Sequence, residues 1–336
     1  MKYLITGGAG FIGSHLADHL LEMGHEVAVI DNLSTGKLEN IAHLQNHERF
    51  SCKIGSVMDY PALEQLVDQC DYIFHLAAAV GVKLIMEHPV ETIITNTHGT
   101  ENVLKLACYY NKKILVASTS EVYGKMMEND NGIHKLRESG DWCLGPTHKR
   151  RWAYACSKAM DEFLALAYSH EKSLPVVIAR FFNTVGPRQT GRYGMVIPNF
   201  VQKALMDEPI PVHGDGNQTR CFTYVGDVVR ACVELLHTPK AEGEIINIGG
   251  EKEITMNDLA RRVKTLTGSH SVIQHIPYDK VYGQGFEDMR RRTPDLSKIQ
   301  NLINYDTKYD MDDILEEVIQ FFRQEEVPMS KVSSFQ

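Results

Sequence analysis

The sequence predicts an α/β protein. We expect a Rossmann-type doubly wound parallel sheet and a smaller, discontinuous C-terminal α/β substrate domain. Short apolar runs alternate with segments of helical periodicity through the first half of the chain, as in a parallel sheet with helices on both faces. A glycine-rich segment follows the first apolar run directly, and one more strand-like run appears after a long irregular stretch.

The expected elements follow from the period of their apolar residues. The runs that we expect as buried strands are residues 3–6, 26–30, 72–75, 114–117, 176–180 and 245–248. Residues 13–23, 61–69, 90–110 and 153–170 have helical spacing. Because the strand at 245–248 returns the chain to the first sheet, we expect one domain from residues 1–180 plus about 226–254. The second domain would comprise 181–225 and 255–325, followed by a flexible tail at 326–336.

Composition narrows the classes of function. The 336 residues carry a net charge of −8, which argues against a nucleic-acid surface. No apolar stretch reaches the length of a membrane span, and the residues before the first strand lack the pattern of a signal peptide, so we expect none. The seven cysteines show no C-x-x-C spacing, so we expect reduced thiols, no metal site and a cytoplasmic protein.

The first apolar run leads into a candidate dinucleotide site. Gly7, Gly10 and Gly13 form a G-x-x-G-x-x-G pattern between a strand and a helix, where a tight turn brings the backbone close to a pyrophosphate. Asp31 ends the next strand and is placed to bind the adenosine ribose, which favours NAD over NADP. We expect further cofactor contacts from Phe11, Ile12, Asn32, Ser56, Val57, Leu76, Ala77 and Ala78.

Two groups of residues supply the candidate chemistry. Thr119, Ser120 and Glu121 follow the strand at 114–117, at the sheet edge where α/β proteins bind ligands. Tyr154 and Lys158 are four residues apart and share one face of the expected helix. An ammonium near a phenol favours the phenolate, so this pair could remove a hydroxyl proton while hydride leaves to NAD.

Together these motifs resemble the extended short-chain dehydrogenase/reductase family of nucleotide-sugar epimerases, dehydratases and decarboxylases. The resemblance extends over nearly the whole chain. It implies that Thr119 hydrogen-bonds the sugar C4 hydroxyl, that Tyr154 deprotonates it, and that a 4-keto sugar forms while NAD stays bound. The implied partner is a nucleotide-sugar, which we expect to be UDP-linked.

The same resemblance implies a substrate site in the later part of the chain. Asn183 and Arg220 would hold the diphosphate, and Val196 and Asn199 would line the base pocket. A late Arg-Thr-Pro-Asp motif would place Arg292 on the diphosphate and Asp295 on the ribose. As a separate hypothesis, Lys83, Arg150 and Arg151 could recognise a uronate carboxylate.

The step after C4 oxidation stays open. Our main prediction is that the enzyme epimerises or modifies the sugar at C5 or C6. Thr119-Ser120-Glu121 resembles the triplet of UDP-glucuronate decarboxylases, whereas 4,6-dehydratases have Asp at the Ser120 position. Residues 78–83 are more similar to epimerases. Decarboxylation and a 5,6- or 4,6-dehydration are therefore the alternatives.

Two other classes are weighed against this enzyme. A dehydrogenase would release NADH instead of retaining the cofactor. A non-catalytic NAD-binding protein would usually lack the tyrosine or the lysine, and both Tyr154 and Lys158 are present. The helices expected at 90–110 and 153–170 carry apolar residues on more than one face, so we also expect a homodimer.

Overall fold

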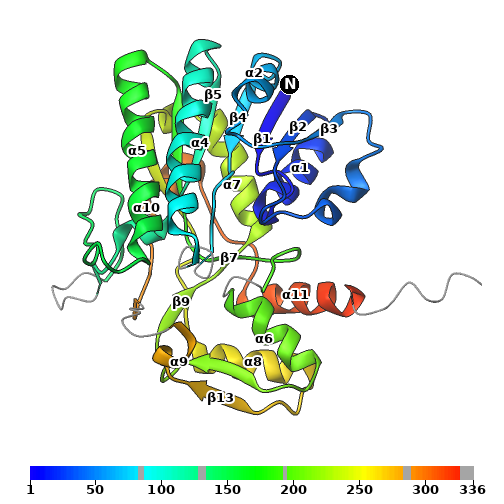
Figure 1. The fold of residues 1–336 in the computed structure, drawn as a ribbon. Coiled ribbons are helices and arrows are strands. Elements are labelled where there is room, and N and C mark those ends of the chain that lie inside the picture. Colours follow the sequence, from blue (N-terminus) through cyan, green and yellow to red (C-terminus); the bar gives the residue numbers. More distant parts are fainter. Residues whose placement is uncertain (82–86, 128–133, 192–194, 283–288, 326–336) are drawn as a thin grey trace, which may run out of the picture.

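The computed structural model describes residues 1–81, 87–127, 134–191, 195–282 and 289–325. Its centre is a seven-stranded parallel sheet with the order β11-β6-β5-β4-β1-β2-β3 (Figure 1). The strands are β1 Lys2–Thr6, β2 Glu26–Asp31, β3 Phe50–Ile54, β4 Tyr72–His75, β5 Lys113–Thr119, β6 Val176–Phe181 and β11 Glu244–Ile248. The predicted α/β class with a doubly wound parallel sheet is confirmed.

Helices cover both faces of this sheet. The helices α1 Phe11–Glu22, α7 Val225–His237 and α10 Ser297–Ile303 share one buried apolar cluster with one face of the sheet. The other face packs against α2 Tyr60–Asp68, α4 Pro89–Tyr109 and α5 Trp152–Lys172. In α1, Leu16, Leu20 and Leu21 are all buried, because their spacing places them on the side of the helix that faces the strands.

The strand β3 was missing from the sequence prediction. It forms the edge of the sheet beside β2, and four of its five residues are exposed. An edge strand with little burial needs no apolar run, so periodicity gives no signal for it.

The later residues build a second layer below the sheet in Figure 1. There α6 Val196–Leu205, α8 Met256–Thr267 and α11 Met311–Glu325 share a buried apolar cluster with the parallel pair β8 Ile210–His213 and β13 Ile273–Ile276. Short pairs join β9 Thr219–Cys221 to β12 Glu253–Thr255, and β7 Thr184–Val185 to β10 Thr223–Tyr224. The remaining elements are α9 Tyr278–Tyr282 and the 3₁₀ turns η1 Leu38–Leu44, η2 Ser120–Tyr123 and η3 Pro239–Ala241.

We keep the division into two domains as a proposal. It is supported by the separate apolar clusters of the two layers and by the pairing of β11 with β6 inside the main sheet. The tail at 326–336 lies outside the described residues. Within the described ranges, no helix is long and apolar enough to cross a bilayer.

Candidate active site

A cavity of about 530 Å³ lies at the carboxyl ends of the central strands, lined by residues of both layers. This volume is typical of small-molecule and cofactor sites. Its lining includes the turns that follow β1 and β4, the start of α1, the end of β5, and residues of α5 and α6. It also reaches β8 and β9 of the second layer. The cavity therefore connects the glycine-rich turn to the predicted substrate segments.

The glycine-rich turn has the close backbone packing that a pyrophosphate site needs. Gly7 has a φ of +74°, and a Cβ added there would lie 2.8 Å from the backbone nitrogen of Ala77. A Cβ on Gly13 would lie 2.3 Å from the carbonyl oxygen of Gly7. Only glycine fits these two positions, which leave the first turn of α1 open to a phosphate group.

Asp31 lies at the end of β2 beside this turn. Its Oδ2 accepts the Ala9 N–H at 2.9 Å and its Oδ1 accepts the Leu33 N–H at 2.8 Å. Burial raises the pKa of this carboxyl group, and the backbone donors oppose that change. The other predicted cofactor residues also line the cavity: Gly10, Phe11, Ile12, Asn32, Ser56, Val57, Leu76, Ala77 and Ala78. These residues fit NAD, and the contacts of the carboxylate with the ribose and of the glycines with the pyrophosphate stay predictions.

The predicted reactive residues meet in the same cavity. Thr119 ends β5, and its hydroxyl accepts the backbone N–H of Glu121 at 3.2 Å, which starts the turn η2. Tyr154 and Lys158 reach the cavity from α5. Burial and the Glu121 carboxylate raise the pKa of the Tyr154 phenol, whereas the Thr119 hydroxyl and Arg292 act in the opposite direction.

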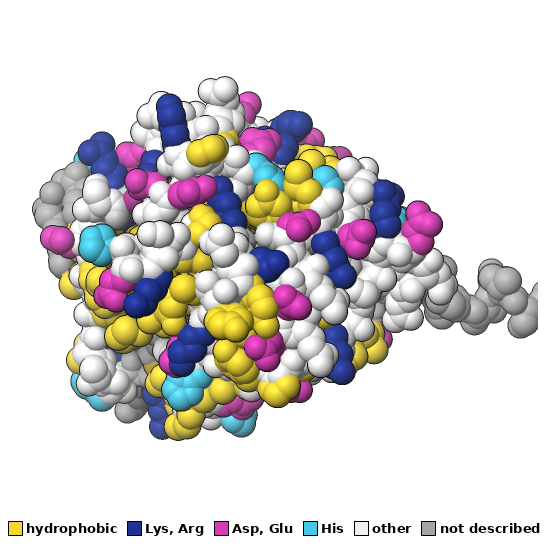
Figure 2. All heavy atoms as spheres, turned by 90° about the horizontal axis from the view of Figure 1, so that it is seen from above, with side chains coloured by type: hydrophobic (Ala, Val, Ile, Leu, Met, Phe, Trp, Pro, Cys, Tyr) yellow, Lys and Arg dark blue, Asp and Glu magenta, His cyan; other side chains and the backbone are white. Residues whose placement is uncertain are grey.

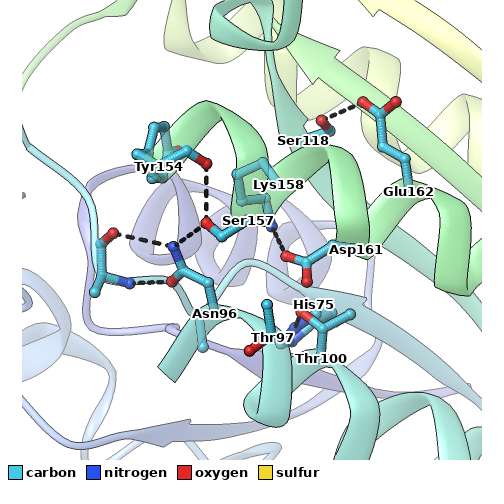
Figure 3. A network of polar contacts seen from close by, with 12 residues as sticks. His75, Asn96, Thr97, Thr100, Ser118, Tyr154, Ser157, Lys158, Asp161 and Glu162 are labelled. Carbon is cyan, nitrogen blue, oxygen red and sulfur yellow. Dashed lines mark hydrogen bonds and ion pairs between the residues drawn. The ribbon is translucent and has the colours of Figure 1, made fainter. Parts of the chain in front are cut away.

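The sequence reasoning missed Asp161. The Lys158 ammonium donates to its Oδ2 at 2.8 Å, and both side chains are buried (Figure 3). From the sequence, we considered the effect of the lysine on the Tyr154 phenol and named no partner for the ammonium. The signal in the sequence was an acidic residue three positions after Lys158, on the same side of the helix.

Arg292 lies at the reactive triplet. Its Nη2 is 2.9 Å from Oε1 of Glu121, and its Nη1 donates to the Ser120 hydroxyl at 3.2 Å. Arg151 also approaches this carboxylate, at 3.6 Å, and both arginines are buried. The resemblance had placed Arg292 on the diphosphate, whereas here its guanidinium contacts Ser120 and Glu121.

The remaining predicted substrate residues are divided. Asn183, Val196, Asn199 and Arg220 line the cavity. Asp295 does not belong to the described lining: its carboxylate accepts from Arg137 Nε at 2.9 Å and from the Ser297 backbone. The prediction of a direct ribose contact is therefore not supported by this geometry. Lys83 lies outside the described residues. The sequence reasoning also missed lining residues without a recognisable motif, namely Lys37, Asn40, Gln189, His213, Gln218 and Tyr278.

Comparison with known proteins gives a consistent result. Residues 4–318 match the family model described as GDP-mannose 4,6 dehydratase. The chain is 44% identical to UDP-N-acetyl-alpha-D-glucosaminuronate decarboxylase of Bacillus cytotoxicus, over 96% of this chain and 98% of the relative. It is 36% identical to UDP-glucuronic acid decarboxylase 1 of Danio rerio, over 96% of this chain and 73% of the relative.

A similar solved structure is UDP-glucuronic acid 4-epimerase of Bacillus cereus in complex with UDP-glucuronic acid and NAD. The TM-score is 0.85 and the sequence identity is 30%, over 97% of this chain and 100% of that chain.

Proposed function

The chain belongs to the family described by the GDP-mannose 4,6-dehydratase model, within the extended short-chain dehydrogenases/reductases, and we propose that it decarboxylates a UDP-linked hexuronate. Members of this family are NAD-dependent nucleotide-sugar enzymes, and NAD is the cofactor of this chain. The observation that carries the proposal is the contact of Arg292 with Ser120 and Glu121 inside the cavity.

The chemistry begins with oxidation at C4. Tyr154 takes the proton of the sugar C4 hydroxyl, which Thr119 at the end of β5 helps to orient. Bound NAD would accept the hydride from C4. The product is a β-keto acid when C5 carries a carboxylate. Breaking the bond from C5 to the carboxylate then releases carbon dioxide and leaves the electron pair in the enolate of the C4 ketone. Protonation at C5, return of the hydride to C4 and return of the Tyr154 proton to O4 complete the reaction.

The position of Arg292 fits the negative charge of a uronate substrate. A substrate carboxylate entering beside Ser120 would meet the Arg292 guanidinium, whose fork can bind two oxygens at once. Glu121 contacts Nη2 of this guanidinium, which helps to fix its direction before a substrate arrives. Ser120 also lacks the carboxyl proton that a dehydratase would use to expel the C6 hydroxyl as water.

The proposed substrate is the 2-acetamido hexuronate, with UDP-glucuronate second. This order is supported by the identities of 44% and 36% to relatives named for these two substrates. The test is incubation of NAD-loaded protein with UDP-N-acetylglucosaminuronate, UDP-glucuronate, UDP-glucose and UDP-N-acetylglucosamine, followed by mass and NMR analysis. Loss of carbon dioxide from a uronate supports the proposal. Unchanged mass with a new stereocentre, loss of water, or no turnover of either uronate contradicts it.

A homodimer formed through α4 and α5 is also proposed. These two helices lie side by side (Figure 1), and their outer surfaces expose large apolar side chains: Val90, Ile93, Ile94, Met160 and Phe163. Figure 2 views the molecule from above, and hydrophobic side chains lie among charged ones on the side where Figure 1 places these helices. Apolar surface of this kind is commonly covered by a second copy of the chain.

A further inference from the structure

Asp161 shares one face of α5 with the catalytic pair. It follows Tyr154 by seven residues and Lys158 by three, so the three side chains lie on the same side of the helix. Only 1% of Asp161 and 3% of Lys158 is exposed. A carboxylate and an ammonium this deeply buried must neutralise each other, because each alone would lose several kcal/mol of hydration, on the order of the cost of a bare ion in a protein.

A series of buried hydrogen bonds runs from the cavity-lining loop after β4 towards Lys158 and Asp161. The Ala77 N–H donates to the Thr6 hydroxyl at 3.2 Å, and that hydroxyl lies 2.8 Å from His75 Nδ1. His75 Nε2 lies 3.0 Å from the Thr100 hydroxyl on α4. Figure 3 shows His75 and Thr100 directly below Asp161 and Lys158. These hydrogen bonds thus link the cavity-lining loop to α4, next to the buried pair on α5.

The donors in this series of hydrogen bonds all point from Thr6 towards Asp161. Burial lowers the pKa of His75 to about 3, so the ring is neutral and has one donor and one acceptor nitrogen. Thr6 already accepts the Ala77 N–H, so its hydroxyl proton is available for Nδ1, and Nε2–H then donates to Thr100. The Thr100 hydroxyl proton remains for Asp161, and this hydroxyl does help to lower the pKa of the carboxyl group against the larger effect of burial.

Charged groups surround the Tyr154 phenol from several elements. Glu121 on η2 and Asp161 on α5 both raise the pKa of this phenol, and Arg292 lowers it. The other titratable groups that interact with the buried ion pair are Glu162 on α5 and His75 on β4. Asp161 is therefore one of two carboxylates that oppose ionisation of the base.

We propose that Asp161 is a positioning residue for proton transfer at C4: its carboxylate holds the Lys158 ammonium and offsets its charge, so that the Tyr154 phenolate can accept a proton and the resulting phenol can return it. Enzymes of this family that retain NAD oxidise and then reduce C4, so one phenol must act first as a base and then as an acid. Lysine and the positive nicotinamide of bound NAD both favour the phenolate. A phenol that ionises too easily returns its proton poorly, and Asp161 corrects this imbalance.

The test needs no substrate. Tyrosinate absorbance of NAD-loaded protein is followed against pH, and the titration of Tyr154 is isolated by subtracting the matching Tyr154→Phe protein. In Asp161→Asn the midpoint should fall by about one pH unit, because a negative charge near the phenol is removed and the ammonium is free to approach it. Thr100→Val removes the hydroxyl that favours the charged carboxylate, so it should shift the midpoint the same way by less.

The matched control is Glu171→Gln, which removes one negative charge from an exposed position on the same helix. Its midpoint should equal that of the unchanged protein. An unaltered midpoint in both Asp161→Asn and Thr100→Val would reduce Asp161 to a structural role and overturn the proposal. A higher midpoint in Asp161→Asn would also overturn it, because Asp161 would then support the phenolate. Neither outcome depends on which sugar is decarboxylated.

Discussion

Arg292 Nη2 lies 2.9 Å from Glu121 Oε1, although 171 positions separate the two residues along the chain. Backbone pairing brings them together. Leu136 N–H donates to the Thr293 carbonyl at 2.8 Å, and the next bond along returns to the Leu136 carbonyl from residue 295. The segment that carries Arg292 is thus held against the loop after η2. These backbone hydrogen bonds position the Arg292 guanidinium in the site.

Truncation of this arginine is the first prediction. Arg292→Ala should lower kcat/KM for the uronate by on the order of 10²-fold or more, because it removes the nearer of the two cations at the half-buried Glu121 carboxylate and the cation proposed to bind the substrate. Arg292→Lys should recover only part of the lost kcat/KM, because lysine keeps the positive charge but not the planar guanidinium that can donate two hydrogen bonds at once. The measurement is carbon dioxide release from UDP-N-acetylglucosaminuronate.

The neighbouring Arg291 provides the control. It pairs with Glu253 at an exposed position, so Arg291→Ala should leave kcat/KM within about twofold of the unchanged enzyme. If Arg291→Ala and Arg292→Ala lowered the rate equally, the contact with Glu121 would not be what matters.

The sequence predicted the fold and much of the cavity because those features depend on local patterns. The period of apolar residues located α1, and the glycine spacing located the turn at Gly13. The edge strand β3 was missed because exposure removes its pattern. The contact of Arg292 with Glu121 depends on long-range backbone pairing, which one sequence does not reveal. Asp161 has no motif of its own, and only the helical register relates it to Lys158.

Arg151 is the second cation at Glu121, and its role in carboxylate recognition is the next prediction. In a Tyr154→Phe background, which blocks turnover, Arg151→Ala should weaken binding of UDP-glucuronate about tenfold or more while binding of UDP-glucose changes little. Isothermal titration calorimetry measures both affinities. The matched variant is Arg150→Ala. The sequence also suggested Arg150 for carboxylate recognition, but this residue is exposed and is not among the described residues that line the cavity, so the variant should bind both ligands normally. An equal loss of affinity for the two ligands would show that Arg151 does not recognise the carboxylate.

The glycine-rich turn predicts the behaviour of a cofactor variant. In Gly13→Ala the new Cβ would lie 2.3 Å from the Gly7 carbonyl oxygen and 2.7 Å from Gly8 Cα, so the turn must open. Purified protein should then carry much less NAD, measured by cofactor release on denaturation. Gly55→Ala is the comparison within the same cavity, because its Cβ would meet nothing closer than 3.7 Å. Retention of NAD by Gly13→Ala would place the pyrophosphate elsewhere.

The proposed dimer gives a prediction about Phe163, which is 59% exposed on α5. Phe163→Glu should yield monomers in sedimentation-velocity experiments, because a charge would be buried without a partner at the interface. Met206 is similarly exposed, at 55%, but lies beyond the end of α6. Met206→Glu should leave the assembly unchanged. Dimers of unchanged stability in Phe163→Glu would exclude this face of α5.

The stability of the protein should depend on pH through His75. Burial lowers the pKa of this histidine to about 3, whereas the unfolded chain titrates near its ordinary 6.5. Below pH 6.5 the unfolded chain therefore takes up a proton that the folded protein does not. The free energy of unfolding should fall by about 1.4 kcal/mol per pH unit until the pH approaches 3, or by about 2 kcal/mol between pH 7 and pH 5.

Comparison with a non-titrating variant isolates this contribution. His75→Gln keeps one donor and one acceptor but cannot titrate. Its free energy of unfolding at pH 7 should be lower than that of the unchanged protein. In urea titrations this difference should narrow by about 2 kcal/mol at pH 5. His15, whose pKa burial lowers to about 4, is present in both proteins and cancels. Glu253, with a pKa lowered to about 2, loses its contribution only below its ordinary value of 4.5, outside this window. The exposed His170→Gln should show the unchanged pH slope, and a constant gap for His75→Gln would mean that His75 takes up its proton in the folded state as well.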